Sequence, residues 1–388
     1  MKPKRKVPKR KLKPFRRKRI KPSWNMLPGN CLERMGDIPD GSVHTVITSP
    51  PYWGMRDYGV DEQHGLEETL DDWLDVQIGV FEQVRRILRD DGTLWLNIGD
   101  NYVGGELVGQ PWALALAMKR AGWILRADII WSKPNPIPQP SRKRPSLSHE
   151  YIFLFVKSSN YFYDDFAVRE RSLHAGLVQK TRKPVYRGKS GARSGGLPSQ
   201  PTVPTSRNLR TVWSIPAGGQ AQESHFAAFP ERLPEICIKA GTSEKGCCEV
   251  CGAPWTRIIE KTELGQKLLG KEWHDRSEAL KRGHRNAPPK AEGELYRSAG
   301  WKPGCDCGLR LAPCRVFDPY AGTGTTGRVA LSLGRSFTGI ELNPEWYKAA
   351  CKRLAEGSSR GGVVTEADLE TRAQLGMMTD LERNLFGM

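Results

Sequence analysis

The sequence predicts an α/β fold in which helices cover a parallel β-sheet. Short apolar runs alternate with segments of helical spacing between residues 43 and 156, and the alternation returns between residues 315 and 344. Such an alternation is typical of β-α-β units, which bring parallel strands together. A glycine-rich run at 322–327 follows a predicted strand and precedes a predicted helix, which is where α/β proteins commonly bind ligands.

The composition is that of a globular protein. The chain has 388 residues, of which 38% are hydrophobic and 27% charged, so it is long enough for two or three domains. No apolar run reaches the roughly 18–20 residues of a membrane helix, and the charged N-terminus lacks the apolar segment of a secretory signal. We therefore expect a cytoplasmic protein that does not span a membrane, with reduced or metal-bound cysteines.

Much of the formal net charge of +17 lies at the N-terminus. Residues 1–22 contain thirteen Lys or Arg, no acidic residue and several prolines. Because like charges repel and proline disfavours helix, this segment is predicted to be a disordered polybasic arm. It can bind nucleic-acid phosphates without sequence preference. A solvated tail with no specific partner is the alternative.

A second basic stretch covers residues 169–215, with ten Lys or Arg against a single Glu. It is also rich in Gly, Ser, Pro and Thr, which indicates a charged loop region between ordered elements. Such a surface can follow a nucleic-acid backbone, although a mobile surface insertion is the alternative. The rest of the chain is slightly acidic, so the protein is not uniformly basic.

The first α/β stretch begins with a strand that runs directly into a proline-rich loop. Its apolar and helical patterns predict strands at 43–48, 93–98, 123–131 and 151–156, and helices at 71–90 and 111–121. Strand 43–48 ends at Ser49-Pro50-Pro51-Tyr52-Trp53, and strand 93–98 is closed by Gly99-Asp100.

The second stretch predicts strands at 315–318 and 336–340 and a helix at 325–334. Asn343 is placed to cap a further helix whose first residue is Pro344. After about residue 357 the chain has only a weak helical pattern.

The glycine-rich loop indicates an adenosine-containing cofactor. Gly322, Gly324 and Gly327 match the G-x-G-x-x-G pattern, in which glycines let the backbone approach a ligand at a helix N-terminus. Glu341, at the end of the next strand, can accept hydrogen bonds from both ribose hydroxyls. The pattern alone fits a dinucleotide or S-adenosylmethionine. Only 66 residues follow Gly322, however, which is too few for the second half of a dinucleotide fold and a catalytic domain.

The loop after the first strand is a candidate catalytic loop. Pro50 and Pro51 fix φ and remove N–H donors, so carbonyls are held rigidly in one direction. Ser49 and the Pro50 carbonyl can accept hydrogen bonds from an exocyclic amine, and the ring of Tyr52 or Trp53 can stack on a flipped-out base. Acceptors on both N–H groups would free the amine lone pair for attack on a sulfonium methyl. The alternative is a proline-rich turn without a catalytic role.

Together, these segments resemble the amino-group DNA methyltransferases of the permuted beta group, in which the catalytic loop precedes the cofactor loop. The resemblance covers about residues 26–355. Its motifs are TSPPYWGMRDYG (48–59), GTLWLNIGD (92–100), GWILRADIIWSKPNP (122–136), SHEYIFLF (148–155), HFAAFP (225–230), VFDPYAGTGTTG (316–327) and GIELNPEW (339–346). The resemblance implies a circularly permuted, Rossmann-like sheet that binds S-adenosylmethionine and methylates double-stranded DNA, with a cognate restriction endonuclease as a possible partner. It also implies a protein of a bacterium, or of a bacteriophage that acts in the cytoplasm of its host.

The resemblance also implies roles for individual residues. The cofactor loop and the ribose acceptor are matched by Asp318, Tyr320, Gly322, Gly324, Thr325 and Glu341. His225 and Phe226 match the segment that closes over the methionine end of the cofactor. Asn30 stands where the family usually has Asp in a cofactor contact. The target-recognition region falls at about 166–224.

The resemblance leaves the target base open. A serine in the S-P-P-Y loop resembles the N4-cytosine subgroup, and N6-adenine is the alternative because some enzymes of this type act on adenine. A C5-cytosine enzyme needs a catalytic cysteine after the cofactor loop, whereas Pro313-Cys314 precedes it. A DNA-binding accessory protein that keeps the fold but lacks activity is the alternative from another class, and the two intact loops argue against it.

Four cysteines have the spacing of a structural zinc site. Cys248 and Cys251 are separated by two residues, and Cys305 and Cys307 by one. Four thiolates suffice for tetrahedral zinc, and Gly252, Gly304 and Gly308 would ease the turns. Cys247 or Cys314 could substitute for one of the ligands. Reduced buried thiols are the alternative, and we expect the cysteines at 31, 237 and 351 to belong to the core.

These observations divide the chain as follows: the arm (1–22), the catalytic half (23–165), the target-recognition region (166–224), a cofactor-closing segment with a helix (225–246), a zinc-ribbon-like cysteine-rich insert (247–312), the cofactor-binding half (313–357) and a C-terminal tail (358–388).

Overall fold

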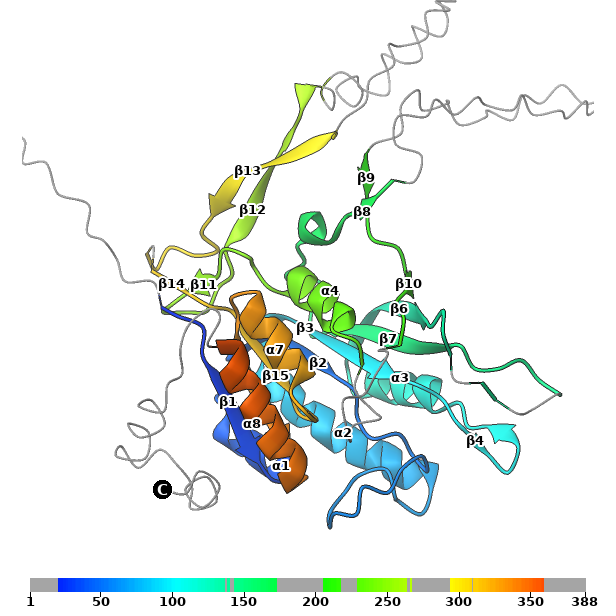
Figure 1. Cartoon of the computed structure of the whole chain (residues 1–388). Helices are drawn as coiled ribbons and strands as arrows, with labels where there is room; N and C mark the ends of the chain where they lie inside the picture. Colours follow the sequence, from blue (N-terminus) through cyan, green and yellow to red (C-terminus); the bar gives the residue numbers. More distant parts are fainter. Residues whose placement is uncertain are drawn as a thin grey trace, which may run out of the picture.

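A computed structural model describes residues 20–136, 138–139, 143–172, 205–217, 229–263, 266, 294–308 and 310–358. Its centre is an eight-stranded sheet (Figure 1). In spatial order the strands are β1 (Trp24–Pro28), β16 (Ser336–Glu341), β15 (Arg315–Asp318), β2 (Val43–Thr48), β3 (Leu88–Ile98), β7 (His149–Val156), β6 (Ile124–Ser132) and β10 (Val212–Ser214). The alternation of strand and helix patterns therefore predicted the fold class.

Helices bury apolar side chains on both faces of this sheet. The core of one face includes residues of α1 (Cys31–Arg34), α2 (Leu70–Ile87) and α3 (Gln110–Arg120). The core of the other face includes residues of α4 (Arg232–Gly241), α7 (Thr325–Ser332) and α8 (Pro344–Ser358). The three-layer arrangement explains why all six residues of β2 are buried, since both faces of a central strand are covered.

The prediction of a purely parallel sheet is wrong at one strand. Strand β7 runs antiparallel to both neighbours, β3 and β6. Parallel neighbours need a crossover connection, usually a helix. The described residues between β6 and β7 form no helix, so the chain turns back directly. This reversal places the first residues of β7 at the same edge of the sheet as the last residues of β2 and β3.

Two boundaries differ from those predicted near the start of β3. The helix predicted to reach residue 90 ends at Ile87, and the strand predicted from Thr93 already begins at Leu88. Leu88 pairs with Val43 across a register shift. The side chain of Leu88 folds over Gly92, where an added Cβ would lie 2.6 Å from Leu88 Cδ1. An irregular pairing of this kind leaves no regular period in the sequence.

Helix termini follow the sequence closely. Thr69 and Asp72 form a capping box at the start of α2. Asn343 Oδ1 accepts hydrogen bonds from the backbone N–H groups of Glu345 and Trp346 at 2.9 and 3.3 Å, which confirms the predicted cap of α8. Edge strand β1, which pairs with β16, was not predicted because its five residues are only partly apolar.

The cysteine-rich insert forms two short antiparallel ribbons, one after the other. The first pairs β11 (Cys247–Cys248) with β14 (Leu311–Ala312), and the second pairs β12 (Thr256–Lys261) with β13 (Tyr296–Lys302). Figure 1 shows the β12–β13 ribbon extending away from the central sheet.

A hairpin, two short helices and a further strand pair complete the description. The hairpin of β4 (Tyr102–Val103) and β5 (Glu106–Leu107) follows β3. The short helices η1 (Met35–Asp37) and η2 (Asp165–Val168) follow α1 and β7, and β8 (Glu170–Arg171) pairs with β9 (Ser206–Arg207). Among the described residues, no helix is both long enough and apolar enough to span a bilayer. The predicted arm, apart from residues 20–22, and the predicted tail after residue 358 lie outside these residues.

Candidate functional site

The candidate catalytic loop and the candidate cofactor loop lie side by side at one edge of the sheet. Strand β2, which leads into Ser49, pairs in parallel with β15, which ends at Asp318. Strand β16, which ends at Glu341, pairs with the other side of β15 in the same direction. The carboxyl ends of parallel strands meet at one edge, so the fold brings together segments that are almost 300 residues apart in sequence.

Glu341 is a buried carboxylate at this edge. Its oxygens accept backbone hydrogen bonds from Gly322 and Asn343, both at 2.8 Å. Burial raises the pKa of Glu341 to about 7, which means that these two bonds do not fully replace the lost hydration of the charged form. Each carboxylate oxygen can accept further hydrogen bonds, so a ligand that presents two hydroxyl donors would fit here.

Asp318 holds the cofactor loop in shape. Its carboxylate accepts from the backbone N–H of Tyr320 at 3.1 Å and from the hydroxyl of Thr326 at 2.8 Å. Burial raises its pKa to about 6. Gly324 precedes α7 with φ of +78°, a conformation that favours glycine, and α7 then begins at Thr325.

Tyr320 connects the candidate cofactor loop to its surroundings, whereas Asn30 caps a helix. The hydroxyl of Tyr320 lies 2.8 Å from His64 Nδ1 and 3.3 Å from Gln77 Oε1. Asn30 caps α1, because its Oδ1 accepts from the N–H of Leu32 at 3.0 Å. The structure therefore assigns Asn30 a capping contact and leaves its predicted cofactor contact untested.

The catalytic loop is fastened to α2 and to the segment after β3. Trp73 on α2 donates its indole N–H to the carbonyl of Pro51 at 3.1 Å. The backbone of Trp53 donates to Gln110 Oε1 at 2.9 Å and accepts from Asn101 Nδ2 at 3.0 Å. These bonds fix the backbone on both sides of Tyr52, as expected for a loop that must hold its acceptors in place.

The side chains of Ser49 and Tyr52 belong to a polar network that the sequence did not predict. Ser49 Oγ lies 3.2 Å from the Tyr52 hydroxyl, which donates to Glu150 Oε2 at 2.9 Å. Asn97 on β3 donates to Glu150 Oε2 at 2.7 Å and to the Tyr52 oxygen at 3.0 Å. Glu150 also pairs with Lys133.

The motifs quoted for the family resemblance contained two members of this network without revealing their roles. Asn97 lies in the motif at 92–100 and Glu150 in the motif at 148–155. Their contact depends on the reversed direction of β7, which places Glu150 beside the end of β3. It also depends on Gly99, where an added Cβ would lie 2.9 Å from Tyr52 Cε2 and 3.1 Å from Glu150 Cγ.

The four predicted metal-binding cysteines come together between the two ribbons. The sulfur atoms of Cys248, Cys251, Cys305 and Cys307 all lie within 4.8 Å of one another. A backbone hydrogen bond from Ala253, together with the Cys305 thiol, lowers the pKa of Cys251 to about 7. The nearby turns use glycine as predicted, with φ of +72° at 252 and +125° at 308.

A second group, formed by His44, Cys247 and Cys314, lies buried beside the first ribbon. His44 Nδ1 accepts from the backbone N–H of Arg315 at 3.0 Å, and Nε2 lies 2.8 Å from the Gly252 carbonyl. Because both ring nitrogens are engaged, His44 serves to connect β2, β15 and the cysteine turn. Cys247 and Cys314 are thus separate from the cluster of four.

The insert contacts the predicted target-recognition region and the segments on either side of it. Arg257 on β12 donates to Asp164 at 2.9 Å and to Glu244 at 2.7 Å, and its guanidinium lies over the ring of Trp301. Near the far end of the ribbon, Glu294 accepts hydrogen bonds from the hydroxyls of Thr205 and Ser206 at 2.7 and 2.6 Å.

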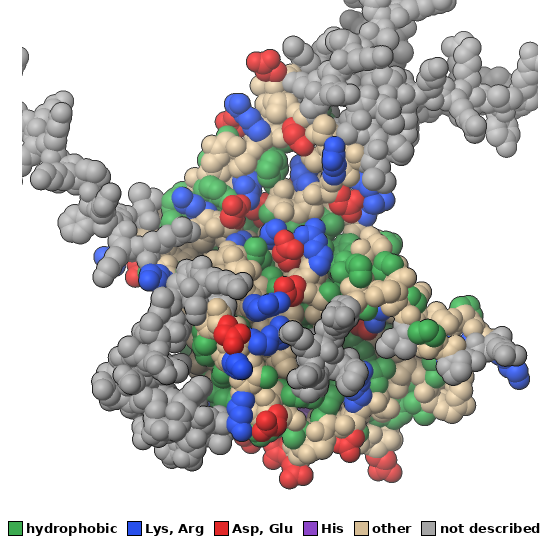
Figure 2. All heavy atoms as spheres, viewed as in Figure 1, with side chains coloured by type: hydrophobic (Ala, Val, Ile, Leu, Met, Phe, Trp, Pro, Cys, Tyr) green, Lys and Arg blue, Asp and Glu red, His purple; other side chains and the backbone are tan. Residues whose placement is uncertain are grey.

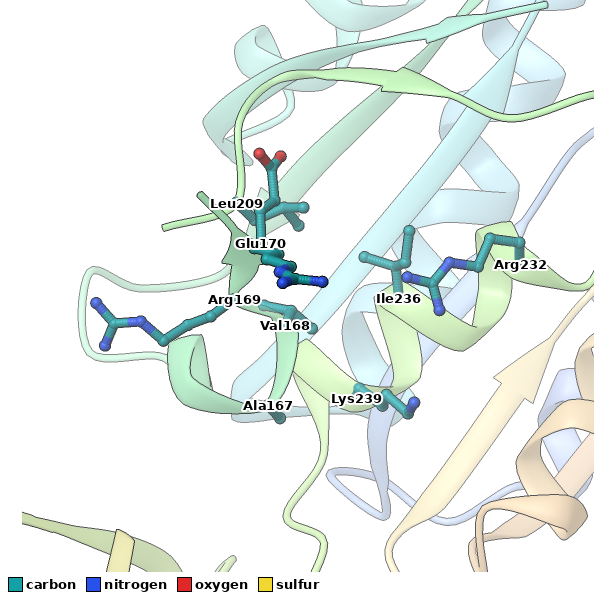
Figure 3. A pocket seen from close by; sticks show the side chains of 9 residues that line it. Ala167, Val168, Arg169, Glu170, Leu209, Arg232, Ile236 and Lys239 are labelled. Atoms are coloured by element: carbon teal, nitrogen blue, oxygen red, sulfur yellow. The ribbon is translucent and has the colours of Figure 1, made fainter. Parts of the chain in front are cut away.

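A hollow of about 310 Å³ lies where the recognition region meets α4 (Figure 3). Its lining includes the basic side chains of Arg169, Arg171, Arg232 and Lys239 together with Glu170. None of the predicted catalytic or cofactor residues lines it. Over the face in Figure 2, basic and acidic side chains are interspersed, which agrees with the nearly balanced charge of the chain outside its arm.

Other predicted site residues are not described. His225 and Phe226 lie outside the described residues, as do 173–204 and 218–224 of the recognition region. Their roles stay predictions.

Comparison with known proteins identifies the family. A model described as DNA methylase matches residues 43–248 and 315–352, and the chain belongs to this family of N4- and N6-amino-methyltransferases. Type II methyltransferase M.Cfr9I of Citrobacter freundii is 32% identical over 358 residues, which cover 84% of this chain and 86% of that protein. Type II methyltransferase M.SmaI of Serratia marcescens is 30% identical over 364 residues, which cover 86% and 91%.

A solved structure has a related fold. The PvuII DNA methyltransferase (cytosine-N4-specific) aligns with a TM-score of 0.53 and 18% identity, covering 95% of this chain and 96% of that one. At this identity the similarity concerns the fold. The family match and the relatives make the chain a DNA methyltransferase.

Proposed function

We propose that the protein transfers the methyl group of S-adenosylmethionine to an exocyclic amine of a base in double-stranded DNA, with N4 of cytosine as the favoured target. The observation that carries this proposal is the position of the Ser49–Tyr52 loop beside Asp318 and Glu341 at one sheet edge. When bound, S-adenosylmethionine supplies an electrophilic methyl group on a sulfonium. The chain's own residues hold the ribose at Glu341 and the amine at Ser49.

The loop makes the amine a better nucleophile. The lone pair of an exocyclic amine is delocalised into the base, and hydrogen-bond acceptors on its N–H groups draw it back onto nitrogen. Ser49 Oγ and the Pro50 carbonyl are the proposed acceptors. Holding two reactants in line can contribute about 7–11 kcal/mol to catalysis, so the rigid attachment of this loop to Trp73, Gln110 and Asn101 is part of the mechanism.

The amine can reach this edge only if the base leaves the DNA stack. A duplex buries its exocyclic amines in paired bases, and enzymes that modify them flip the nucleotide outward. An aromatic ring of the catalytic loop, that of Tyr52 or Trp53, would stack on the extruded base. The fold shared with an enzyme named as cytosine-N4-specific and the serine of the loop favour cytosine, and N6 of adenine is the second candidate.

Product analysis tests the target base. DNA is incubated with the protein and S-adenosylmethionine labelled in its methyl group, and then digested to nucleosides. Label in N4-methylcytosine is the expected result. Label in N6-methyladenine would replace the favoured target with the second candidate, and absence of label from every DNA tested would favour an inactive accessory protein.

Cofactor affinity is expected to depend on the ionisation of Glu341. Its pKa of about 7 means that the carboxyl group is protonated below neutral pH in the free protein. A ribose hydroxyl donates to the charged carboxylate, so affinity should rise with pH from 6 to 8 and be up to about tenfold weaker at pH 6 than its limit. Titration calorimetry at several pH values measures this. The Glu341→Gln variant should bind weakly with little pH dependence, and an equally steep pH dependence in that variant would assign the effect to another group.

The four-cysteine cluster is proposed to hold one structural zinc ion. Tetrahedral zinc with bonds of about 2.3 Å places its sulfur ligands roughly 3.8 Å apart, and the cluster's sulfurs already lie within 4.8 Å. The ion would lock the junction of the two ribbons. Glu294, just before β13, contacts Thr205 and Ser206 of the recognition region, and Arg257 on β12 contacts Asp164 just before that region. The insert would therefore also support the recognition region against DNA.

The N-terminal arm is expected to add affinity but no sequence preference. Deletion of residues 1–22 removes thirteen positive charges. DNA binding should weaken, and the slope of log affinity against log salt should become shallower by about 0.9 for each phosphate that the arm neutralises. Binding titrations at four salt concentrations measure the slope, and mapping of methylated sites gives the control. A changed target sequence would show that the arm takes part in recognition.

The relatives named type II methyltransferases favour a role in restriction and modification. In that role the protein would protect one DNA sequence from a cognate endonuclease. Resistance of DNA from an expressing host to purified endonucleases of known specificity would identify that sequence.

A further inference from the structure

The network behind Ser49 contains one group that can only accept hydrogen bonds. Glu150, at the start of β7, receives the hydroxyl of Tyr52, the amide of Asn97 and the ammonium group of Lys133. Its side chain is 16% exposed. These partners come from the loop after β2, from β3 and from the segment after β6, so the fold converges on this carboxylate.

The carboxylate determines the direction of the other hydrogen bonds. Tyr52 has a single hydroxyl proton, which it donates to Glu150. Burial keeps the pKa of Tyr52 well above its usual value, so the hydroxyl retains this proton. The amide atom of Asn97 that lies 2.7 Å from the carboxylate must be its NH2 group, which also donates to the Tyr52 oxygen. In the contact between Ser49 and Tyr52 at 3.2 Å, serine is therefore the donor.

A serine hydroxyl has two lone pairs, so when it donates inward and receives the long contact from Asn97 Nδ2 at 3.5 Å, one lone pair remains for another donor. This is the state in which Ser49 can accept an N–H of the target amine. A hydroxyl free to rotate could instead point its proton at the amine nitrogen and oppose the attack. Glu150 acts on Ser49 indirectly, through Tyr52 and through Asn97, whose Nδ2 lies 2.7 Å from Glu150 Oε2 and 3.5 Å from Ser49 Oγ. Glu150 is therefore a positioning residue for the substrate contact.

We propose that Glu150 fixes Ser49 as an acceptor and receives, through Tyr52, the proton that the target amine loses on methylation. This inference rests on the proposed methyl transfer to an exocyclic amine and holds for cytosine or adenine. It assigns a proton path to the protein, from Ser49 Oγ through the Tyr52 oxygen to Glu150 Oε2.

The step balances within the described groups. A nitrogen–methyl bond forms while the sulfur–methyl bond breaks, with its electron pair remaining on sulfur. The amine nitrogen, now positively charged, gives one proton to Ser49 Oγ. Ser49 passes its own proton to the Tyr52 oxygen, and Tyr52 passes its proton to the carboxylate. The products are a neutral methylated amine and a protonated Glu150, which can return its proton to solvent because the side chain is partly exposed.

The test compares single-turnover methyl transfer in the full-length protein and its variants. Glu150→Gln keeps the size of the side chain but places an amide where the carboxylate accepts. We expect the methyl-transfer rate to fall about 10²–10⁴-fold, the usual contribution of a positioned proton acceptor, while KM for DNA and cofactor affinity change less than threefold. Asp128→Asn removes an equal charge from an exposed position on neighbouring β6 and should leave the rate unchanged.

Tyr52→Phe tests the same path from its middle. It retains the ring and removes the hydroxyl, so its loss should match that of Glu150→Gln, and the double variant should be no slower than the slower single variant. A Glu150→Gln rate within threefold of the unmodified protein, or losses that multiply in the double variant, would overturn the proposal. Should Glu150→Gln fail to fold, Tyr52→Phe alone must show the loss.

A failure of the proton path can be distinguished from a failure of the proposed function. The target base is read from the nucleoside formed by the unmodified protein, whereas the proton path is read from the rates of the variants. An adenine product with an impaired Glu150→Gln variant would retain the inference and change the target.

Discussion

Replacement of Ser49 by alanine is expected to lower the methyl-transfer rate by about 10²–10³-fold, the cost of removing one preorganised hydrogen-bonding group from an active site. The variant loses an acceptor for the target amine and the first group of the proton path. Its cofactor affinity should stay unchanged, because Ser49 accepts no bond from the residues assigned to the ribose. Single-turnover assays and calorimetry on the same preparation measure both quantities.

Glu341→Ala is the matched variant, and we expect it to lower cofactor affinity while leaving much of the methyl-transfer rate at saturating cofactor. It removes a charged acceptor from the ribose contact, and a hydrogen bond to a charged group is worth about 1.5–3 kcal/mol. Cofactor affinity should fall at least tenfold, and saturating cofactor should restore much of the rate. Equal reductions of affinity in Ser49→Ala and Glu341→Ala would mean that the two sides of the site have been assigned incorrectly.

The second large effect is expected on zinc content when a cysteine of the four-cysteine cluster is replaced. Purified protein should contain about one zinc per chain, and Cys251→Ser should reduce that to near zero. Apparent binding free energies of structural zinc in small domains reach about 10–16 kcal/mol, far more than two short ribbons can supply by themselves. Loss of the ion should therefore expose residues 247–312 to proteolysis and weaken DNA binding. Elemental analysis and limited proteolysis are the measurements.

The control for this experiment is a cysteine outside the cluster. Cys237 is fully buried on α4, so Cys237→Ala can lower thermal stability but should retain the zinc. A metal content near zero in the unmodified protein, unchanged after refolding with zinc, would leave the cluster as four reduced thiols. Full zinc content in Cys251→Ser would instead point to a different ligand set.

The sequence predicted what depends on local pattern and short motifs. Apolar periodicity located the central strands, glycine and proline marked both loops, and Asn343 with Pro344 defined the start of α8. Cysteine spacing selected the set of four sulfurs that the fold brings together. In each case one segment carries its own signal, because dihedral preference or ligand chemistry restricts the residue types.

What the sequence did not predict depends on how distant strands are arranged. The reversed direction of β7 goes with a connection whose described residues form no helix, and no residue type encodes it. The role of Glu150 follows in turn from that reversal, since only then does the start of β7 lie beside Asn97 and Tyr52. Polar residues that act through tertiary contacts carry no periodicity, so a motif can contain them without indicating what they do.

The separation of charge has a similar explanation. Net charge indicated a nucleic-acid partner, but basic and acidic side chains are interspersed over the face in Figure 2. Phosphate attraction is therefore assigned to the arm and to the basic recognition region, and the catalytic edge is free to hold the buried acids Asp318 and Glu341.

Methylation mapping of a bacterial host that expresses the protein tests the central claim most directly. Genomic DNA from cells with the unmodified protein, with Ser49→Ala and with an empty vector is sequenced by a method that distinguishes N4-methylcytosine, N6-methyladenine and C5-methylcytosine. We expect N4-methylcytosine at one short sequence motif, present with the unmodified protein and absent with Ser49→Ala. The absence of any new methylated amine, or methylation that persists at full level in Ser49→Ala, would contradict that claim.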